Sequence, residues 1–425
     1  MKTQWLCGHR WIGGLAIVLV CMLSQAAVIE AAIFAPNLTA DAHDATPGDG
    51  ICATTAGRCT LRAAIEEANA LPGADEIILI SGNYRLSRSL GELAISDDLQ
   101  IFGGGTVSAR LSGNKPTRSS LGNRAFHIVS PANAMISNIS IRRAGLRLSC
   151  GGGVLVDAGA SLSLMNVQIA RSISTTDGGA ICNFGTLALS NVQLRRNRVY
   201  GGNGAGLYNA GTTSVADSVL ASNFGARLGG AIYNAAGAAL TVQSGTFWRN
   251  NAFRGGAIWL DSSSTAQVTN ATIVQNFAED SGAGLYNDGT AAAVLTSVTL
   301  SRNKAALGGA LGGTRTSVED VILNNSRTPF DDMAQNNCES PASVVSLGHN
   351  IDSAATCGLA AVGDLNNTDP LLGALRYHGG LTNTMLLLAG SPAIDAGDGV
   401  DCPSTDQNGV ARVGTCDIGA VEYVP

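Results

Sequence analysis

A motif of the form Gly-Gly-Ala-Ile, or a close variant of it, recurs seven times through the middle of the chain. The copies begin at Gly151, Gly178, Gly204, Gly229, Gly255, Gly282 and Gly308, with spacings of 27, 26, 25, 26, 27 and 26 residues. A fixed period of this length is typical of proteins that stack one structural unit on the next. The repeat therefore constrains the fold more than any other feature of the sequence.

The segments between these glycines predict strands and not helices. They contain short alternating runs, such as Val268–Ile273 and Val294–Leu300, and no long apolar stripe with a period of 3.6 residues. Several short strands in each 26 residues predict an all-β fold, the right-handed parallel β-helix of the pectate-lyase-like class. Each coil is expected to rise by one strand spacing, about 4.8 Å.

Four rows of side chains recur in register with the motif. Two rows are apolar and are expected to stack inside the coils: Ile169, Leu194, Leu220, Phe247, Ile273, Leu300 and Leu323, and Ile181, Leu207, Ile232, Ile258, Leu285 and Leu311. Two rows are polar and are expected to form hydrogen bonds along the axis: Ser172, Asn197, Asn223, Asn250, Asn276 and Asn303, and Asn183, Asn209, Asn234 and Asn287. At bends, Asn also tolerates left-handed backbone geometry.

An outward position lies between two inward ones and carries Tyr208, Tyr233, Trp259 and Tyr286. If these rings are exposed, the row predicts a surface for carbohydrate stacking or protein contact. The alternative is that the rings only cover the sheet or pack under a loop.

The N-terminus has the pattern of a secretory signal peptide, which we place at residues 1–26. Lys2 and Arg10 precede the apolar run Trp11–Leu23, and Ala26 ends a small-residue cleavage site. We therefore expect a secreted or cell-surface protein, with no transmembrane span in the mature chain.

Eight cysteines follow the signal segment, and an even number in an exported chain predicts disulfides. They are Cys52, Cys59, Cys150, Cys182, Cys338, Cys357, Cys402 and Cys416. Nearest-neighbour pairing predicts 52–59, 338–357 and 402–416; a 150–182 bond requires contact between coils. Zinc is the competing interpretation, but no Cys-x-x-Cys occurs and the chain has only 5 His.

Residues 27–74 are expected to close the first coil, before a β-helix over 75–330. Leu61, Ile65 and Ala68 share one helical face, and Thr60 is a candidate N-cap. The stretch Cys59-Thr-Leu-Arg-Ala-Ala-Ile65, and its continuation through Gly82-Asn-Tyr84, resembles the CSLREA domain of bacterial surface β-helix proteins.

Residues 331–425 are expected to form a C-terminal cap region. Asp369-Pro-Leu-Leu-Gly373, Gly390-Ser-Pro-Ala-Ile-Asp-Ala-Gly397 and Cys416-Asp-Ile-Gly-Ala-Val-Glu422 resemble the choice-of-anchor Q domain. The repeat itself is similar to those of polymorphic outer-membrane proteins. These resemblances imply an exported bacterial β-helix, and they name no reaction.

Catalytic residues are not evident from the sequence. The acids of the repeat are few and do not fall on one row, whereas a glycoside hydrolase needs two facing carboxylates. Arg142, Arg171, Arg195, Arg196, Arg249 and Arg254 are expected to be solvated arginines that cover a sheet, with a loose cationic strip as the alternative. His127 lies in a strand and can face either way.

Composition narrows the function further. Apolar residues make up 45% of the chain, which excludes a disordered protein, and the net charge of −6 argues against nucleic acid. We predict no metal and no cofactor; Ca²⁺ in an acidic terminal loop, at Asp41, Asp44 and Asp49 or at Asp395, Asp398, Asp401 and Asp406, is the alternative. The favoured function is non-catalytic binding of glycan or another surface; a polysaccharide lyase or glycoside hydrolase, and a structural spacer, are the alternatives.

Overall fold

The protein is described here from a computed structural model that covers residues 31–104, 109–113, 122–328, 335–400 and 402–425. The predicted signal peptide, residues 1–26, lies outside the described residues. Among the described residues, no helix is long and apolar enough to cross a membrane.

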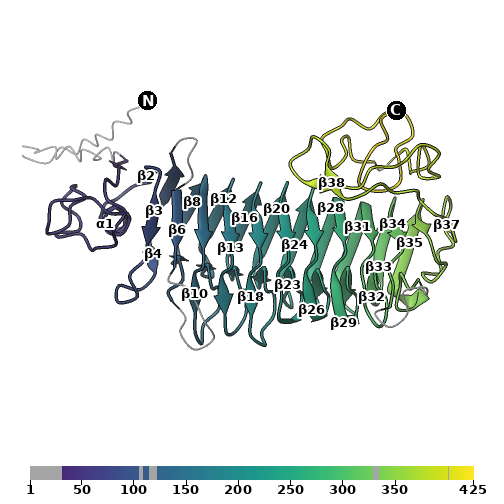
Figure 1. Ribbon diagram of the computed structural model, residues 1–425, viewed down its shortest axis with the longest axis horizontal. Coiled ribbons are helices and arrows are strands. Elements are labelled where there is room, and N and C mark those ends of the chain that lie inside the picture. The colour runs from purple at the N-terminus through teal and green to yellow at the C-terminus, as the bar shows by residue number, and fades with distance from the viewer. Residues whose placement is uncertain (1–30, 105–108, 114–121, 329–334, 401) are drawn as a thin grey trace, which may run out of the picture. The chain divides into compact units, whose positions relative to one another are not determined.

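The chain winds into a right-handed parallel β-helix whose coils stack side by side (Figure 1), which confirms the predicted fold. Successive coils pair in parallel with partners about 26 residues apart, for example Leu194 with Leu220 and Leu207 with Ile232. The repeat length of the sequence is therefore the length of one coil.

The largest sheet has 22 strands and is built from two series joined by a bend. The first series contains β1 (Ile33–Phe34), β2 (Asp75–Leu79), β5 (Leu99–Gly103), β8 (Asn133–Ser137), β12 (Ser161–Met165), β16 (Thr186–Ser190), β20 (Thr212–Ala216), β24 (Ala239–Gln243), β28 (Thr265–Val274), β31 (Ala292–Ser301), β33 (Thr316–Glu319) and β35 (Val344–Gly348). The second series contains β3 (Asn83–Arg85), β6 (Ala109–Ser112), β9 (Ile139–Arg142), β13 (Gln168–Ala170), β17 (Gln193–Arg195), β21 (Val219–Ala221), β25 (Thr246–Trp248), the second halves of β28 and β31, β34 (Ile322–Asn324), β36 (Ile351–Asp352) and β37 (Leu365–Asn366).

A second sheet of nine strands forms another face of the coils. It contains β4 (Leu93–Ile95), β7 (Phe126–Ile128), β11 (Val154–Val156), β15 (Ile181–Asn183), β19 (Leu207–Asn209), β23 (Ile232–Asn234), β27 (Ile258–Leu260), β30 (Leu285–Asn287) and β32 (Leu311–Gly313). Short strands lie between the two faces: β10 (Gly145–Leu146), β14 (Ile173–Ser174) and β18 (Arg198–Val199), then β22 (Ala226–Leu228), β26 (Asn251–Arg254) and β29 (Phe277–Ser281). The remaining elements are η1 (Pro341–Ser343), β38 (Arg376–Tyr377) and β39 (Asn383–Thr384).

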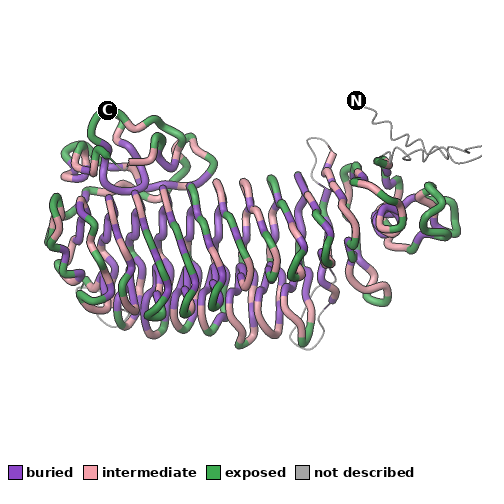
Figure 2. Tube along the Cα trace, turned by 180° about the vertical axis from the view of Figure 1, so that it is seen from behind, coloured by how far each residue is buried: buried purple, intermediate pink, exposed green. Residues whose placement is uncertain are grey.

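Both predicted apolar rows lie inside the coils, where every member is fully buried. Figure 2 shows the resulting alternation of buried and more exposed segments along each coil. Each large side chain stacks on its equivalent in the next coil, as Phe247 does on Leu220 and Ile273. This repeated burial of apolar surface is the main stabilising term of the fold.

The first predicted asparagine row is a continuous buried ladder. The side chain of Asn223 illustrates its geometry: Nδ2 donates to Oδ1 of Asn250 at 2.9 Å and to the carbonyl oxygen of Leu194 at 3.0 Å. The same pattern holds at Asn197, Asn250 and Asn276. The left-handed backbone conformation at this bend is adopted by the residue before each ladder asparagine, and not by the asparagine itself.

The second predicted asparagine row is interrupted. Nδ2 of Asn183 donates to Asn209, and Nδ2 of Asn209 donates to Asn234, at 2.9 and 2.7 Å. Leu260 occupies the equivalent position in the following coil, so the chain of side-chain hydrogen bonds stops before Asn287.

The helix α1 (Leu61–Ala68) closes the N-terminal end of the solenoid. The Thr60 side chain accepts a hydrogen bond from the amide of Ala63, as a helix N-cap does, and Leu61 and Ile65 pack into the main core. The buried carboxylate of Glu67 accepts hydrogen bonds from the amides of Gly48 and Gly50 and so holds the preceding loop.

The C-terminal part departs from the expected boundary at residue 330. β35, β36 and β37 still pair with the preceding coils, so the solenoid continues into the region that we expected to be a cap. The following residues fold back over the flank of the coils (Figure 1). Gln407 is buried there and forms hydrogen bonds with Thr246 and Thr272 of the solenoid, at 3.1 and 2.6 Å.

Candidate functional site

Eight residues at one bend of successive coils have a left-handed backbone, with φ between 48° and 58°. We call them the corner row: Arg143, Arg171, Arg196, Ser222, Arg249, Gln275, Arg302 and Asn325. Each follows a strand of the second series, and those from Arg196 to Arg302 directly precede an asparagine of the buried ladder. Because the ladder residue points inward, the neighbouring corner-row side chain points out to solvent; the five arginines of the row are all exposed.

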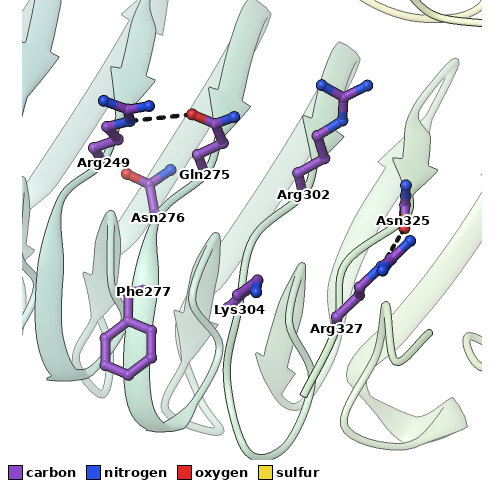
Figure 3. Close-up of a pocket in the computed structure, with 8 residues that line it drawn as sticks. All are labelled: Arg249, Gln275, Asn276, Phe277, Arg302, Lys304, Asn325 and Arg327. Carbon is purple, nitrogen blue, oxygen red and sulfur yellow. Dashed lines mark hydrogen bonds between the residues drawn. The ribbon is translucent and has the colours of Figure 1, made fainter. Parts of the chain in front are cut away.

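The corner row lies along a groove formed by four adjoining hollows, with volumes of about 710, 520, 530 and 640 Å³. Neighbouring hollows share lining residues: Arg85 and Arg143 between the first two, Arg171 and Arg196 between the next two, and Arg249 between the last two. We call this feature the arginine groove. Figure 3 shows its C-terminal part, where Arg249, Gln275 and Arg302 project side by side from successive coils.

The groove is lined by cations, and its described lining residues include no Asp or Glu. The basic side chains are Arg85, Arg88, Arg110, Arg142, Arg143, Arg171, Arg195, Arg196, Arg198, Arg249, Arg302, Lys304 and Arg327. They make up about half of the 26 Lys and Arg of a chain whose net charge is −6. Positive charge is therefore concentrated in the groove.

Two arginines of the groove, Arg142 and Arg249, donate hydrogen bonds to neutral groups. Arg142 donates to Gln168 at 2.7 Å and to Ser140 at 3.0 Å, and Arg249 donates to Gln275 at 3.2 Å. Within the described part of the chain, Arg171, Arg196 and Arg302 form no ion pair. A guanidinium group without a carboxylate partner retains its donors for a ligand.

Mutual repulsion of the arginines is evident in their electrostatics. Burial, followed by the charges of Arg110, Arg171 and Arg143, lowers the pKa of Arg142. Burial and the charge of Arg196 lower the pKa of Arg195, whose Nε is buried without a hydrogen-bond partner. An anionic ligand would relieve this repulsion.

Of the six arginines proposed from the sequence, five line the groove and one does not. Arg254 instead forms an ion pair with Asp280. Eight basic residues of the groove were not proposed from the sequence: Arg85, Arg88, Arg110, Arg143, Arg198, Arg302, Lys304 and Arg327. Arg302 could have been found from the sequence, because the position immediately before each ladder asparagine is also a row and is mostly Arg.

The aromatic row lies on the outer face of the nine-stranded sheet, as predicted, but it is not the exposed surface that we expected. Tyr233 and Trp259 are only 8% and 4% exposed. The rings stack in two pairs, Tyr208 on Tyr233 at 5.2 Å and Trp259 on Tyr286 at 4.4 Å between centroids. Leu228 and Ala235 pack against them. The rings pack against one another and cover the sheet, which is the alternative that the sequence left open. A ligand role for this row stays a prediction.

His127 occupies the same outward row nearer the N-terminal end. Its Nδ1 lies 3.0 Å from Glu92 and its Nε2 lies 2.9 Å from Asp157, while Arg124 forms an ion pair with Glu92 at 2.7 Å. The hydrogen bond to Glu92, and then that to Asp157, raise the pKa of His127 despite its partial burial. Both ring nitrogens are engaged, which describes a structural ion cluster.

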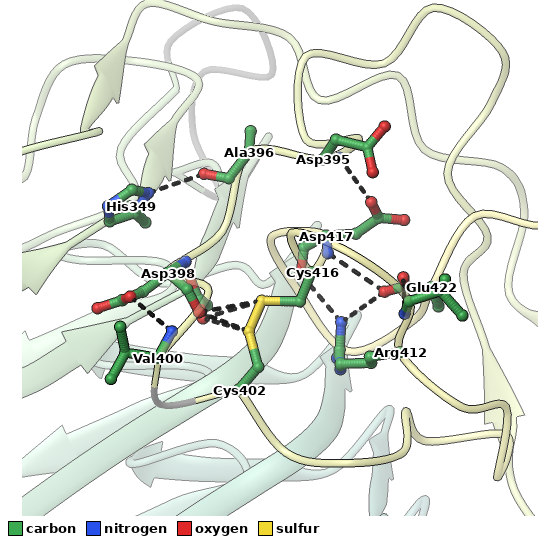
Figure 4. Close-up of a disulfide and its surroundings, with 12 residues drawn as sticks. His349, Asp395, Ala396, Asp398, Val400, Cys402, Arg412, Cys416, Asp417 and Glu422 are labelled. Carbon is green, nitrogen blue, oxygen red and sulfur yellow. Dashed lines mark hydrogen bonds and ion pairs between the residues drawn. A yellow bond between two sulfur atoms is a disulfide. The ribbon is translucent and has the colours of Figure 1, made fainter.

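The eight cysteines form four disulfides, the three short-loop pairs that the spacing predicts, 52–59, 338–357 and 402–416, and the 150–182 bond between coils. Figure 4 shows the disulfide between Cys402 and Cys416. It lies against the buried Asp320 of the solenoid, whose Oδ2 is 3.7 Å from each sulfur. Burial raises the pKa of Asp320 to about 6. Asp320 and the two sulfurs converge, but sulfurs joined in a disulfide are not thiolate ligands for a metal.

Carboxylates in the two acidic terminal loops accept hydrogen bonds from backbone amides. Asp44 accepts from Thr46 and Ala53, and Asp406 accepts from Asn408 and Val410, all at 2.8 Å. This is the turn chemistry expected of Asp in loops. Ca²⁺ in these loops stays an untested prediction, and Asp401 lies outside the described residues.

Comparisons with known proteins agree with the fold. A family model described as a right-handed β-helix region matches residues 125–326. The crystal structure of pectate lyase Pel9A is similar to this chain, with a TM-score of 0.52 and 12% sequence identity over 93% of this chain and 98% of that chain. At this identity the likeness shows the fold alone. No curated protein sequence matches the chain.

Proposed function

We propose that this protein is an exported or cell-surface β-helix that binds an anionic polysaccharide in the arginine groove. The observation that carries the proposal is the continuous groove of basic side chains whose described lining lacks carboxylates. Anionic polymers present charges along their length, and a solenoid presents one corner-row side chain in each coil, about every 4.8 Å.

The cellular placement rests on the signal-peptide pattern and on four disulfides, which form and persist in oxidising compartments. The resemblances of the two ends to the CSLREA and choice-of-anchor Q domains support the same placement. The choice of the groove revises the ligand site predicted from the sequence, because the aromatic row is largely buried.

A binding role is favoured over hydrolysis because hydrolysis of a glycosidic bond needs two carboxylates, and the described lining of the groove offers none. A polysaccharide lyase is the second candidate, since the fold is that of a pectate lyase. The two candidates share their ligand class, so one set of polymers tests both.

The test is retention of the mature protein on immobilised polygalacturonate, hyaluronan and neutral dextran at increasing salt. We expect retention on the anionic polymers only, weakening as salt rises. Combined replacement of Arg196, Arg249 and Arg302 by Ala should abolish it, whereas replacement of the exposed Arg58, Arg227 and Arg376, which lie off the groove, should not. Binding that ignores salt or the groove variant contradicts the proposal.

The same incubations report on catalysis. Ultraviolet absorbance follows unsaturated products of a lyase, and reducing ends follow hydrolysis, each with and without Ca²⁺. Product formed by the intact protein and lost in the groove variant would replace the binding function with an enzymatic one.

A further inference from the structure

Two rows of side chains flank the buried asparagine ladder along the C-terminal half of the arginine groove, and most of their members line it. One is the corner row from Arg196 to Arg302. The other lies two residues further along each coil, and we call it the ridge row: Arg198, Phe224, Asn251, Phe277 and Lys304. The register is given by the pairs Arg198 with Phe224, Asn251 with Phe277 and Phe277 with Lys304.

Over these five coils the chemistry alternates with a period of two coils. The first, third and fifth coils carry a cation in the corner row, at Arg196, Arg249 and Arg302. The second and fourth coils carry a neutral polar corner residue, and these are the coils whose ridge residue is Phe224 or Phe277. Cationic coils and aromatic coils therefore succeed each other along the groove.

Both phenylalanines of this stretch lie at the protein surface and not in the core. Phe224 is 39% exposed, and Phe277 is partly exposed beside Asn276 in the hollow of Figure 3. The guanidinium of Arg198 lies 5.1 Å from the Phe224 ring centroid and so brings a cation next to the apolar face. Exposed rings beside cations suit a ligand with both apolar faces and negative charges.

The distance between equivalent coils restricts which polymers can match the groove. Two coils advance by about 9.6 Å, twice the strand spacing of about 4.8 Å. An extended pair of linked sugar rings has a similar length, so one sugar faces each coil. The N-terminal half of the groove lacks the alternation, because Arg143, Arg171 and Arg196 follow one another in successive coils.

We infer that the groove binds a linear polysaccharide in which acidic and uncharged sugars alternate, lying parallel to the solenoid axis. This inference rests on the proposed function. The acid groups lie over Arg196, Arg249 and Arg302, and the ring faces of the uncharged sugars stack on Phe224 and Phe277. A polymer with an acid on every sugar places a carboxylate against the apolar ring face of each phenylalanine, which desolvates that charge.

The experiment compares hyaluronan oligosaccharides, which carry one carboxylate in each disaccharide, with oligogalacturonates of equal length, which carry one on every sugar. Affinities are measured by titration calorimetry for the intact protein and for the double variant Phe224→Ser, Phe277→Ser. Because the variant removes both stacking faces, we expect it to weaken hyaluronan binding about tenfold or more. Oligogalacturonate binding should change less than threefold.

A matched control is Phe253→Ser, because Phe253 is 44% exposed but lies outside the two rows. A converse variant, Ser222→Arg with Gln275→Arg, fills the neutral corner positions and should shift the preference toward oligogalacturonate. Equal affinity for both oligosaccharides, together with no effect of the double variant, overturns the alternation and leaves polyanion binding intact. Failure of both oligosaccharides to bind overturns the proposed function as well.

Discussion

The aromatic row and the corner row are built by the same device, one outward side chain in each coil, and they have opposite fates. Stacking coils bring like side chains together. Uncharged rings attract one another at this spacing, so Tyr208 stacks on Tyr233 and Trp259 stacks on Tyr286. The stacked rings bury much of one another's surface. Guanidinium groups repel, so Arg171, Arg196 and Arg302 stay exposed and keep their donors. The spacing of a solenoid row therefore does not define a site; the chemistry repeated at that spacing does.

The largest effect on stability is expected in the aromatic row. Trp259→Ala should lower the free energy of unfolding by about 3–5 kcal/mol, because it removes a buried ring that stacks on Tyr286. Denaturant unfolding measures the loss. Tyr377→Ala is the control, since that ring is 69% exposed. A loss below about 1 kcal/mol would mean that Trp259 is accessible, which would restore the aromatic row as a candidate ligand surface.

The ladder beneath the arginine groove should show the next largest effect. Asn250→Ala removes the acceptor of the Asn223 amide and side chain and the donor to Leu220, and it leaves these buried groups unpaired. A cost of about 2–3 kcal/mol is expected in the same denaturant assay. Asn366→Ala, at an exposed position of the last coil, should cost less. Near-equal losses would show that the ladder carries no special share of the stability.

The ion cluster around His127 predicts that the free energy of unfolding depends on pH. The folded pKa of His127 is raised, so its stabilising contribution is complete below the unfolded value of about 6.5 and is lost as pH rises through the folded pKa. Glu92 and Asp157 contact the two ring nitrogens, and Arg124 contacts Glu92. Unfolding of His127→Gln at several pH values should lack this decline. A wild-type decline that persists unchanged in the variant assigns it to another group.

The smallest effect is expected for single arginines of the corner row. Arg302→Ala should change the free energy of unfolding by no more than about 0.5 kcal/mol, because the side chain is exposed and forms no ion pair in the described part of the chain. The same variant should weaken binding to anionic polymers. Thermal unfolding and retention on hyaluronan, measured together, separate the two roles; a large stability loss would make the row structural.

Much of the fold follows from the sequence because a solenoid reduces tertiary structure to a period. Once Leu194 and Leu220 are placed one repeat apart, their stacking is fixed, and the same arithmetic predicted the apolar rows and the Asn197–Asn303 ladder. The N-cap role of Thr60 is equally local, since it depends on residues within one helical turn.

The site was only partly predictable, because exposure depends on what packs over a row. The sequence places Trp259 outside the sheet but does not show that Tyr286 and its neighbours bury it. It places Arg142 and Arg249 on different coils but does not show that hollows between them join into one groove. The course of the C-terminal segment was also outside its reach, since Gln407 meets Thr272 across 135 residues.

The sequence by itself thus determined the coil, its length and its inward and outward positions, because these are properties of a repeating unit and its nearest neighbour. The tertiary structure alone decided which outward row is open, which cations lack a carboxylate and where the final segment lies. Those outcomes arise from contacts between rows and between distant segments, and no period in the sequence encodes them.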